Sequence, residues 1–412
     1  MEKRDVVIIG GGSAGLAAAV KLHENGVRDI LIIEREKQPG GVLRQCIHDG
    51  FGLTRFGVSK SGPEYTQRFI DEAENAGIEI LTNATVFDLS RERVVTVNTR
   101  EGLRKIQAKA VVLTMGCRER TRGALAIPGA RPSGVFNAGV AQSYVNLYNT
   151  MVGKEVIIMG SGDIGMIMAR RLTLEGAHVK AMFEILPYPS GLPRNIEQCL
   201  HDYDIPLYLS RSVVQIHGEE RINGVTVMDY DENLNPKPGT EEFIPCDTLI
   251  MSVGLIPENE LSLKAGVALD ARTNGALVDE FYQTTVPGIF AAGNVLHVHD
   301  LVDFVSLEAE ALADSVSRYV LDGALPESAI EIKANAPIGY TVPQRVSGAA
   351  DFRISMRVRR PVGRCRVELR QGGELVAAKT LQKAIPAEMI QLDIKSESIR
   401  TTQEIEVTVN EI

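Results

Sequence analysis

The clearest pattern along the chain is a short apolar run that leads into a glycine-rich turn. Val6–Ile9 is a continuous β-branched run, and residues 10–15 read Gly-Gly-Gly-Ser-Ala-Gly. A stretch of small, helix-favouring residues follows at Leu16–Leu22, and a second apolar run, Ile30–Ile33, ends at Glu34. Uninterrupted apolar runs bounded by turn residues are typical of strands buried on both faces. The pattern therefore predicts strand, tight turn, helix, strand and a terminal acid.

The same order of elements recurs 150 residues further along. An apolar run at Val156–Met159 precedes a second glycine-rich segment at 160–165, a helical stretch at Ile167–Leu172, and a run at Val179–Phe183 that ends at Glu184. The constant offset joins the pairs Gly10/Gly160, Gly12/Gly162, Gly15/Gly165, Glu34/Glu184, Pro39/Pro189, Gly41/Gly191 and Arg44/Arg194. A single G-x-G-x-x-G is a weak signal, but two copies, each with an acid 19 residues past the last glycine, predict two dinucleotide-binding folds.

The residue types suit nucleotide binding. The first glycine allows the tight turn, the second lets the backbone approach a pyrophosphate, and the third lets helix and strand pack closely. The helix N-terminus then offers N–H groups and a partial positive charge to the anion. Glu34 and Glu184 stand where a carboxylate would accept hydrogen bonds from a ribose. No Arg directly follows Glu184, so NADH is favoured over NADPH at the second site. Glycines that only shape turns are the competing interpretation, and two matched copies disfavour it.

Three further strand-and-glycine segments complete the pattern. Residues 110–116 and 247–254 are buried-strand runs that end in glycine, and each would close one nucleotide-binding unit. Residues 287–294 form one more strand that ends in Gly-Asn, and a helix is expected over 305–321.

The last part of the chain has a different period. Residues 331–412 predict short alternating strands separated by Gly, Pro and polar breaks, which suggests a small all-β sandwich. The strands expected there are Phe352–Arg359, Arg364–Arg370, Glu374–Lys379, Met389–Ile394 and Glu404–Val409. Seven arginines lie between Arg353 and Arg370. They could dock an acidic partner, although a solvated strand face is the default interpretation.

Composition narrows the class of protein. The 412 residues are 44% hydrophobic and 24% charged with a net charge of -9, which suits globular domains and argues against nucleic acid as a partner. Residues 331–412 carry a net charge of +3.

No apolar run reaches the length of a membrane span, and no signal peptide is expected, so we expect a cytoplasmic protein. Five widely spaced cysteines make a disulfide framework or a cysteine zinc site unexpected. No metal is expected.

These motifs resemble the pyridine nucleotide–disulfide oxidoreductase superfamily over residues 5–320. The resemblance implies that the first fold binds FAD and that the inserted one binds NAD(P). The expected fold class is α/β, with two Rossmann-like three-layer domains, the NAD domain inserted in the FAD domain, and a C-terminal all-β sandwich. The expected boundaries are 1–120 and 245–328 for the FAD domain, 121–244 for the NAD(P) domain and 329–412 for the β-rich domain.

The chain departs from the superfamily pattern at two places. The closing Gly-Asp motif is replaced by Gly293-Asn294, whose amide can still hydrogen-bond a hydroxyl of the flavin's ribityl chain. The paired cysteines of the disulfide reductases are replaced by Cys46 alone. A dithiol relay to a small disulfide is therefore unavailable at that position.

Three segments resemble a narrower subgroup. Residues 40–53, 116–122 and 293–300 are similar to the oxidoreductases that accompany anaerobic-type glycerol-3-phosphate dehydrogenases, and to the small flavin subunits of opine oxidase and hydrogen cyanide synthase. The resemblance implies hydride transfer between NAD(H) and FAD, with electrons exchanged with a partner dehydrogenase or a small acceptor. The partner would dock partly through the C-terminal domain, and an oligomer is possible. A nucleotide-sensing or scaffold flavoprotein without turnover, and a stand-alone 2-hydroxy acid or amine dehydrogenase, remain alternatives.

The resemblance and the motifs together give the expected binding residues. Those for FAD are Gly10, Gly12, Ser13, Ala14, Gly15, Glu34, Arg35, Gly41, Val42, Val86, Thr114, Gly116, Gly293, Asn294 and Val302. Those for NAD are Gly160, Gly162, Asp163, Ile164, Gly165, Glu184 and Gly254.

Candidate catalytic residues are Cys46, His48 and His299. A thiolate at Cys46 could contact the flavin or relay electrons, and His48 could donate a proton, but both could equally line the pocket. His297 or His299 could donate a proton near the start of the last helix. Asp303 is expected to cap that helix. Arg118, Arg120 and Arg122 could bind phosphate or an anionic substrate, although a solvated linker is the favoured interpretation.

Overall fold

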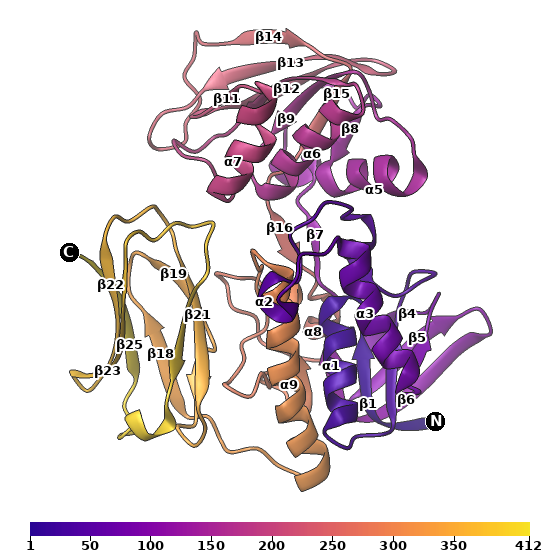
Figure 1. The fold of residues 1–412 in the computed structure, drawn as a ribbon, viewed down its shortest axis with the longest axis vertical. Coiled ribbons are helices and arrows are strands. Elements are labelled where there is room, and N and C mark those ends of the chain that lie inside the picture. The colour runs from indigo at the N-terminus through magenta and orange to yellow at the C-terminus, as the bar shows by residue number, and fades with distance from the viewer. The chain divides into compact units, whose positions relative to one another are not determined.

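A computed structural model describes all residues, 1–412, and the chain separates into two compact units (Figure 1). One unit, which we call the outer unit, consists of Met1–Cys117 and Pro257–Ile412. The other, Arg118–Ile256, lies between these two segments in the sequence, and we call it the inserted unit.

A seven-stranded sheet forms the centre of the outer unit. Its order is β3-β2-β1-β6-β5-β4, with β17 paired to β6. The strands are β1 (Glu2–Ile9), β2 (Ile30–Ile33), β3 (Glu79–Leu81), β4 (Thr85–Leu89), β5 (Val94–Thr99), β6 (Gly102–Leu113) and β17 (Ile289–Ala291). Val6 and Ile8 of β1 point into one hydrophobic core, and Val7 and Ile9 into another. Because both faces of the sheet are buried, the strand reads as an unbroken apolar run.

Helices cover one face of this sheet. α1, α3 and α9 pack together there, as Figure 1 shows, and supply the apolar side chains of one core. The helical segments of the outer unit are α1 (Ser13–Glu24), η1 (Gly41–Gln45), α2 (Leu53–Phe56), α3 (Gly62–Asn75), α8 (Glu260–Lys264), η3 (Gly293–Val295) and α9 (Val302–Asp322).

The inserted unit repeats the parallel arrangement. Its five-stranded parallel sheet has the order β11-β10-β9-β15-β8, and a separate antiparallel sheet has the order β12-β13-β14. The strands are β8 (Val135–Asn137), β9 (Glu155–Met159), β10 (His178–Phe183), β11 (Leu207–Tyr208), β12 (Arg211–Gly218), β13 (Ile222–Asp229), β14 (Glu242–Pro245) and β15 (Thr248–Met251). The helices are α4 (Arg122–Leu125), α5 (Ala138–Tyr148), α6 (Asp163–Leu174), α7 (Pro193–Cys199) and η2 (His201–Tyr203). Where the chain crosses between units, β7 (Cys117–Glu119) pairs with β16 (Leu255–Pro257).

The C-terminal part of the outer unit is a two-sheet β structure. One sheet has the order β20-β18-β25-β22-β23, the other β19-β21-β24, and side chains from both form one core. The elements are β18 (Ile330–Ala334), β19 (Ile338–Val342), β20 (Arg345–Val346), β21 (Phe352–Val358), β22 (Cys365–Gln371), β23 (Glu374–Leu381), β24 (Ile390–Ile394), η4 (Ser396–Ser398) and β25 (Ile405–Glu411). We call residues 329–412 the sandwich.

The predicted fold class, two Rossmann-like folds with an all-β C-terminal segment, is confirmed by this architecture. The last helix begins three residues earlier than expected, at Val302. None of the helices combines the length and the apolar content that a membrane-spanning segment requires.

Candidate functional site

The first glycine-rich loop is a tight turn between β1 and α1. Gly10 has a φ of +109°, and a Cβ there would lie 2.4 Å from the carbonyl oxygen of Thr114. A Cβ at Gly15 would lie 1.9 Å from the Gly10 oxygen. The Thr114 hydroxyl donates to the Ile9 and Gly10 carbonyls at 3.0 Å and holds the turn against the end of β6. The backbone is therefore compact only because these positions lack side chains.

Other predicted flavin residues meet this loop. The Gly40 N–H donates to the Gly11 carbonyl at 2.7 Å, and a Cβ at Gly41 would lie 3.0 Å from the Gly12 Cα. On the other side, a Cβ at Gly293 would lie 3.1 Å from the Ala14 Cβ. The start of α1 is thus framed by residues from three distant parts of the chain.

The remaining predicted flavin residues lie around this frame or along the sheet edge. Ser13 is buried in the first turn of α1, Val42 is an exposed residue of η1, Val86 lies on β4, Gly116 follows β6, Val302 begins α9, and Arg35 is exposed beside Glu36.

The Glu34 carboxylate is buried at the end of β2. One oxygen accepts the Gly11 N–H and the other accepts the Glu36 N–H, both at 2.8 Å. These bonds fix the acid beside the glycine-rich loop, and its role as a ribose acceptor remains a prediction.

The inserted unit contains the matching turn. Gly160 has a φ of +92°, and a Cβ there would lie 2.1 Å from the Ser252 carbonyl oxygen. The Gly165 N–H donates to the Ser252 hydroxyl at 3.0 Å. Gly254, two residues after Ser252, has a φ of +104° and lies just past the end of β15. The carboxyl ends of β9 and β15 are therefore held together by these contacts. Open α/β sheets bind their ligands outside the carboxyl ends of their strands.

Glu184 has a richer set of partners than Glu34. Its Oε2 accepts the Ser161 N–H at 3.0 Å, the Ser161 hydroxyl at 2.6 Å and the Ser190 hydroxyl at 2.8 Å. Its Oε1 accepts the Leu186 N–H at 3.1 Å.

Asp163, in the first turn of α6, accepts the Leu192 N–H at 2.8 Å and so holds the following loop. Ile164, also in that turn, packs against the core of this unit.

Both helix starts fit a dinucleotide. α1 and α6 have the N-cap residues Gly12 and Gly162, neither with a side-chain cap. A Cβ at Gly12 would meet nothing closer than the Gly41 Cα at 3.8 Å. Helix starts without a side-chain cap present N–H groups to an anion. α1 has no acid in its first turn. α6 has Asp163 there, and the carboxylate of Asp163 accepts the Leu192 N–H of the following loop.

Cys46 and His48 lie in the loop after η1. Burial raises the pKa of the Cys46 thiol to about 12, which opposes thiolate formation at neutral pH. Its Sγ lies 3.4 Å from the Val42 carbonyl oxygen. The His48 ring lies 4.9 Å from the Phe51 ring, measured between centroids. These contacts match the packing interpretation of both residues, and a redox or acid role for either remains a prediction.

The predicted candidate His299 belongs to a buried polar cluster. His297 Nε2 lies 2.7 Å and His299 Nε2 lies 3.3 Å from Oε2 of Glu308 on α9. Glu308 Oε1 accepts the Gly293 N–H at 2.8 Å. Asn294 Oδ1 accepts the His299 N–H at 3.0 Å. The two imidazoles hold the pKa of Glu308 well below its usual range despite burial, and burial lowers the pKa of His297.

Glu308 was missed in the sequence analysis. Val305, Ala309 and Leu312 form an apolar stripe at helical spacing, and Glu308 lies on it. A charged residue on the buried face of an amphipathic helix needs a partner, and this was the signal that could have found it.

The predicted role of Asp303 is wrong. The N-cap of α9 is Leu301, and the Asp303 carboxylate instead accepts the N–H groups of Gly52, Thr54 and Arg55, at 2.8, 2.7 and 3.2 Å. Asp303 thus caps α2, a helix some 250 residues away in sequence. Sequence spacing cannot reveal a cap supplied from another element.

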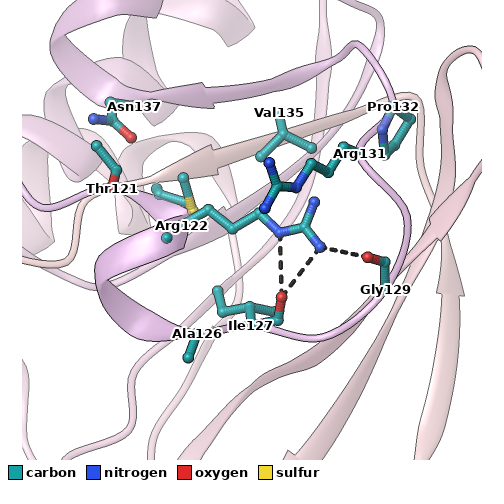
Figure 2. A pocket seen from close by; sticks show the side chains of 11 residues that line it. Thr121, Arg122, Ala126, Ile127, Gly129, Arg131, Pro132, Val135 and Asn137 are labelled. Atoms are coloured by element: carbon teal, nitrogen blue, oxygen red, sulfur yellow. Dashed lines mark hydrogen bonds between the residues drawn. The ribbon is translucent and has the colours of Figure 1, made fainter.

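A cavity of about 610 Å³ lies in the inserted unit between residues 121–137 and Met251 (Figure 2). Arg122 lines it, but its guanidinium donates to the carbonyls of Ile127, Gly129 and Ala130. Arg122 therefore stabilises the turn after α4, and its half-buried guanidinium is bound to backbone carbonyls. The Arg120 N–H donates to the Gly254 carbonyl, and Arg118 begins the unit.

The fold and the two helix starts define a class: a protein with two dinucleotide-binding Rossmann folds in one chain. Residues 4–311 match the pyridine nucleotide-disulphide oxidoreductase family, and the chain belongs to that family. Its cofactors are accordingly FAD and NAD(P)H, and the predicted oxidoreductase class is confirmed.

Curated relatives of this chain include components of larger enzymes. Hydrogen cyanide synthase subunit HcnB of Pseudomonas aeruginosa is 28% identical over 314 residues, which cover 70% of this chain and 66% of HcnB. One of the subunits of opine oxidase from Agrobacterium tumefaciens is 26% identical, with 70% of this chain and 61% of that subunit covered. The chain thus spans a little under two thirds of the length of these relatives.

Solved structures agree on the fold. Thioredoxin reductase from T. acidophilum has a TM-score of 0.63 at 23% identity, and the match covers 77% of this chain and 98% of that one.

Proposed function

We propose that the protein transfers hydride between NAD(H) and FAD. The observation that carries this proposal is the pair of helix starts, α1 and α6, each without a side-chain cap and each beside a buried carboxylate. A chain that only sensed a nucleotide would need one such site. When bound, FAD and NAD(H) supply the hydride chemistry themselves, between flavin N5 and nicotinamide C4.

The residues of the chain bind and orient the two cofactors. The α1 start would hold the FAD pyrophosphate, with Glu34 toward the ribose, and the α6 start would hold the NAD pyrophosphate, with Glu184 in the matching role. The individual cofactor contacts expected from the sequence remain predictions. Glu184 and the serines bound to it favour NADH, because a carboxylate repels a 2′-phosphate.

Anaerobic titration with NADH tests this function. The purified FAD-loaded protein should lose its visible flavin absorbance with one equivalent of NADH and regain it with an oxidant. If FAD binds but NADH leaves the spectrum unchanged, hydride transfer is wrong and a nucleotide-sensing or scaffold role is preferable. Turnover of a 2-hydroxy acid or an amine by the protein alone would support a stand-alone dehydrogenase instead.

We further propose that the electrons are exchanged with a partner dehydrogenase, such as a glycerol-3-phosphate dehydrogenase, in the cytoplasm. Support comes from Cys46 standing alone where a dithiol relay would be, and from relatives named as subunits of hydrogen cyanide synthase and opine oxidase. Anaerobic mixing of the reduced protein with a purified glycerol-3-phosphate dehydrogenase in its oxidised form, which accepts the electrons, should reoxidise the flavin faster than buffer does. Equal rates would contradict this partner.

The sandwich is the proposed docking surface for part of that contact. Five of its seven clustered arginines are paired with acids, as Arg353–Asp393, Arg357–Asp300, Arg360–Glu411, Arg366–Glu368 and Arg370–Glu368. Because most of these arginines are already paired with acids, docking would depend on the shape of the sandwich surface and on the few arginine charges that no acid balances. The reversal Arg364→Glu should weaken partner binding without changing NADH reduction.

A further inference from the structure

We propose that His297, His299 and Glu308 form a binding site for a divalent transition-metal ion, with Zn²⁺ as the best-suited species. His297 and His299 follow the closing Gly-Asn motif, and Glu308 lies on the second turn of α9. The three ligand atoms lie within 4.8 Å of one another, and the side chains of the two histidines are at most 1% exposed and that of Glu308 8%. This proposal does not depend on the hydride-transfer function.

The hydrogen bonds around His299 fix its ring so that it offers a lone pair to Glu308. Asn294 Oδ1 accepts the His299 backbone N–H, which identifies that atom as the amide oxygen. His299 Nδ1 lies 3.3 Å from the same oxygen and must therefore carry the proton. In the neutral ring, Nε2 is then an acceptor, and the backbone-anchored amide supplies the outer contact that metal-binding histidines commonly have.

With His299 Nδ1 carrying the only ring proton, two acceptors face each other inside the protein. His299 Nε2 lies 3.3 Å from Glu308 Oε2 without hydrogen-bond geometry, and it is buried with no hydrogen-bond partner. Lone pairs of a nitrogen and a carboxylate at this separation repel unless a proton or a metal ion lies between them. A metal ion shared by both atoms resolves the arrangement.

The charge balance also calls for a cation. Glu308 forms ion pairs with the two histidines only and with no Lys or Arg. The nearby guanidinium of Arg357 is used by Asp300 and by three backbone carbonyls. With no Lys or Arg at hand, the buried carboxylate is compensated either by a proton on an imidazole or by a bound cation, since buried charges are normally paired or bound to metals.

The ligand set selects the kind of ion. Two imidazole nitrogens and one carboxylate oxygen suit Zn²⁺, Co²⁺ or Fe²⁺ and disfavour Mg²⁺ and Ca²⁺, which prefer oxygen. Two ligands of a tetrahedral ion with bonds of about 2.1 Å lie roughly 3.4 Å apart. The His299–Glu308 separation matches this, whereas the 2.7 Å between His297 Nε2 and Glu308 Oε2 is a hydrogen bond that the ion would replace, with a widening of the pair.

The ion would join two segments of the outer unit. It would tie the loop after η3 to α9, where Glu308 Oε1 already holds the Gly293 N–H. The Tyr340 ring on β19 lies edge-on to His297, 5.9 Å between centroids, so the sandwich covers the cluster. Such a position suits a structural ion that keeps the closing motif in place.

The test uses the full-length FAD-loaded protein, stripped with a chelator and titrated with Zn²⁺ and separately with Co²⁺. We expect one equivalent to bind tightly, the Co²⁺ form to show a ligand-field spectrum, and Zn²⁺ to raise the thermal midpoint. His299→Gln and Glu308→Gln should each weaken Zn²⁺ binding by at least tenfold. His178→Gln is the matched control, because His178 is exposed and also contacts a glutamate.

Three results would overturn the site. They are the absence of stoichiometric binding by the unaltered protein, equal weakening in the His178 control, and unchanged affinity in both cluster variants. The absence of binding would assign the cluster to a shared proton alone. The measurement on the unaltered protein decides the matter even where a cluster variant fails to fold.

Discussion

Glu34 and Glu184 are equivalent in sequence but differ in their surroundings. Glu34 accepts backbone N–H groups only, whereas Glu184 also accepts two serine hydroxyls, from Ser161 and Ser190. Each carboxylate is therefore fixed before any nucleotide arrives, and a fixed acceptor costs less conformational entropy on binding. The difference suggests that the second acid is held more firmly for discrimination between nucleotides.

Glu184→Gln should change that discrimination. The neutral amide removes the repulsion of a 2′-phosphate while keeping an acceptor for the Ser161 hydroxyl, so the affinity ratio of NADPH to NADH should rise about tenfold, or about 1.4 kcal/mol. Fluorescence titrations with both nucleotides measure the ratio. Glu34→Gln is the control and should weaken FAD binding with the ratio unchanged; a ratio that also stays constant in Glu184→Gln would contradict the assignment.

Asp279 predicts a specific pH dependence of stability. Burial and the neighbouring Glu280 raise its pKa to about 7, against backbone N–H groups of Phe281 and Gln283 that favour the ionised form. A raised carboxyl pKa means that the folded state holds its proton longer than the unfolded state. Stability from this group is therefore complete below about pH 4 and is lost as the pH rises toward 7.

Asp279→Asn should remove this loss. The difference in free energy of unfolding, variant minus unaltered protein, should increase between pH 5 and pH 7. The increase should be about 1.4 kcal/mol per pH unit, and the difference should then level off. Urea unfolding at several pH values measures it. A difference that does not vary with pH would show that Asp279 titrates normally.

At the scale of elements, the turns were more predictable than the distant contacts. Both glycine-rich turns and their acids follow from local spacing, because a tight βα turn needs glycine wherever it occurs. The predicted strands of the sandwich agree with β21 to β25 within two residues at each end. By contrast, β18 to β20 were not anticipated, since they are short and β18 pairs with β25 some 70 residues away.

Long-range contacts also account for the errors at the candidate site. Asp303 caps α2 rather than its own helix, and the partner of His299 is a helical residue, Glu308. Both depend on how α9 packs against loops from other parts of the chain. A single sequence carries no direct signal for such packing, so local motifs gave the cofactors and not the polar cluster.

Gly160→Ala tests whether the inserted turn tolerates a side chain. Its Cβ would lie 2.1 Å from the Ser252 carbonyl oxygen, in addition to the strain of a φ of +92°. We expect NADH reduction of the flavin to fall at least a hundredfold while FAD stays bound. Gly176→Ala is the matched control, because Gly176 has a φ of +89° with nothing within 4 Å, and it should cost only the backbone strain. Similar losses in both variants would show that strain rather than the clash matters.

At the scale of the molecule, the sandwich is joined to the rest of the outer unit by half-buried polar contacts. Glu280 accepts the Ser347 N–H, and the Gln344 side chain accepts the Val278 N–H. Arg357 on β21 makes the largest set: it donates to Asp300 and Val298 and to the carbonyls of Pro386 and Ala387. The segment that carries His297 and His299 is thereby tied to the sandwich.

Arg357→Ala should loosen this junction. The change leaves the Asp300 carboxylate, whose side chain is 9% exposed, buried without its cation, and breaking one partner of a buried pair costs about 3–5 kcal/mol. Urea unfolding and limited proteolysis between residues 323 and 330 should both show the loss. Arg353→Ala is the matched control on the same strand, since its pair with Asp393 is exposed and such pairs contribute about 1 kcal/mol or less.

Adding Asp300→Asn to Arg357→Ala should restore part of the stability, because the uncompensated charge is gone. If the two single variants lose equal stability, Arg357 is an ordinary surface residue and the sandwich is held by its apolar contacts alone.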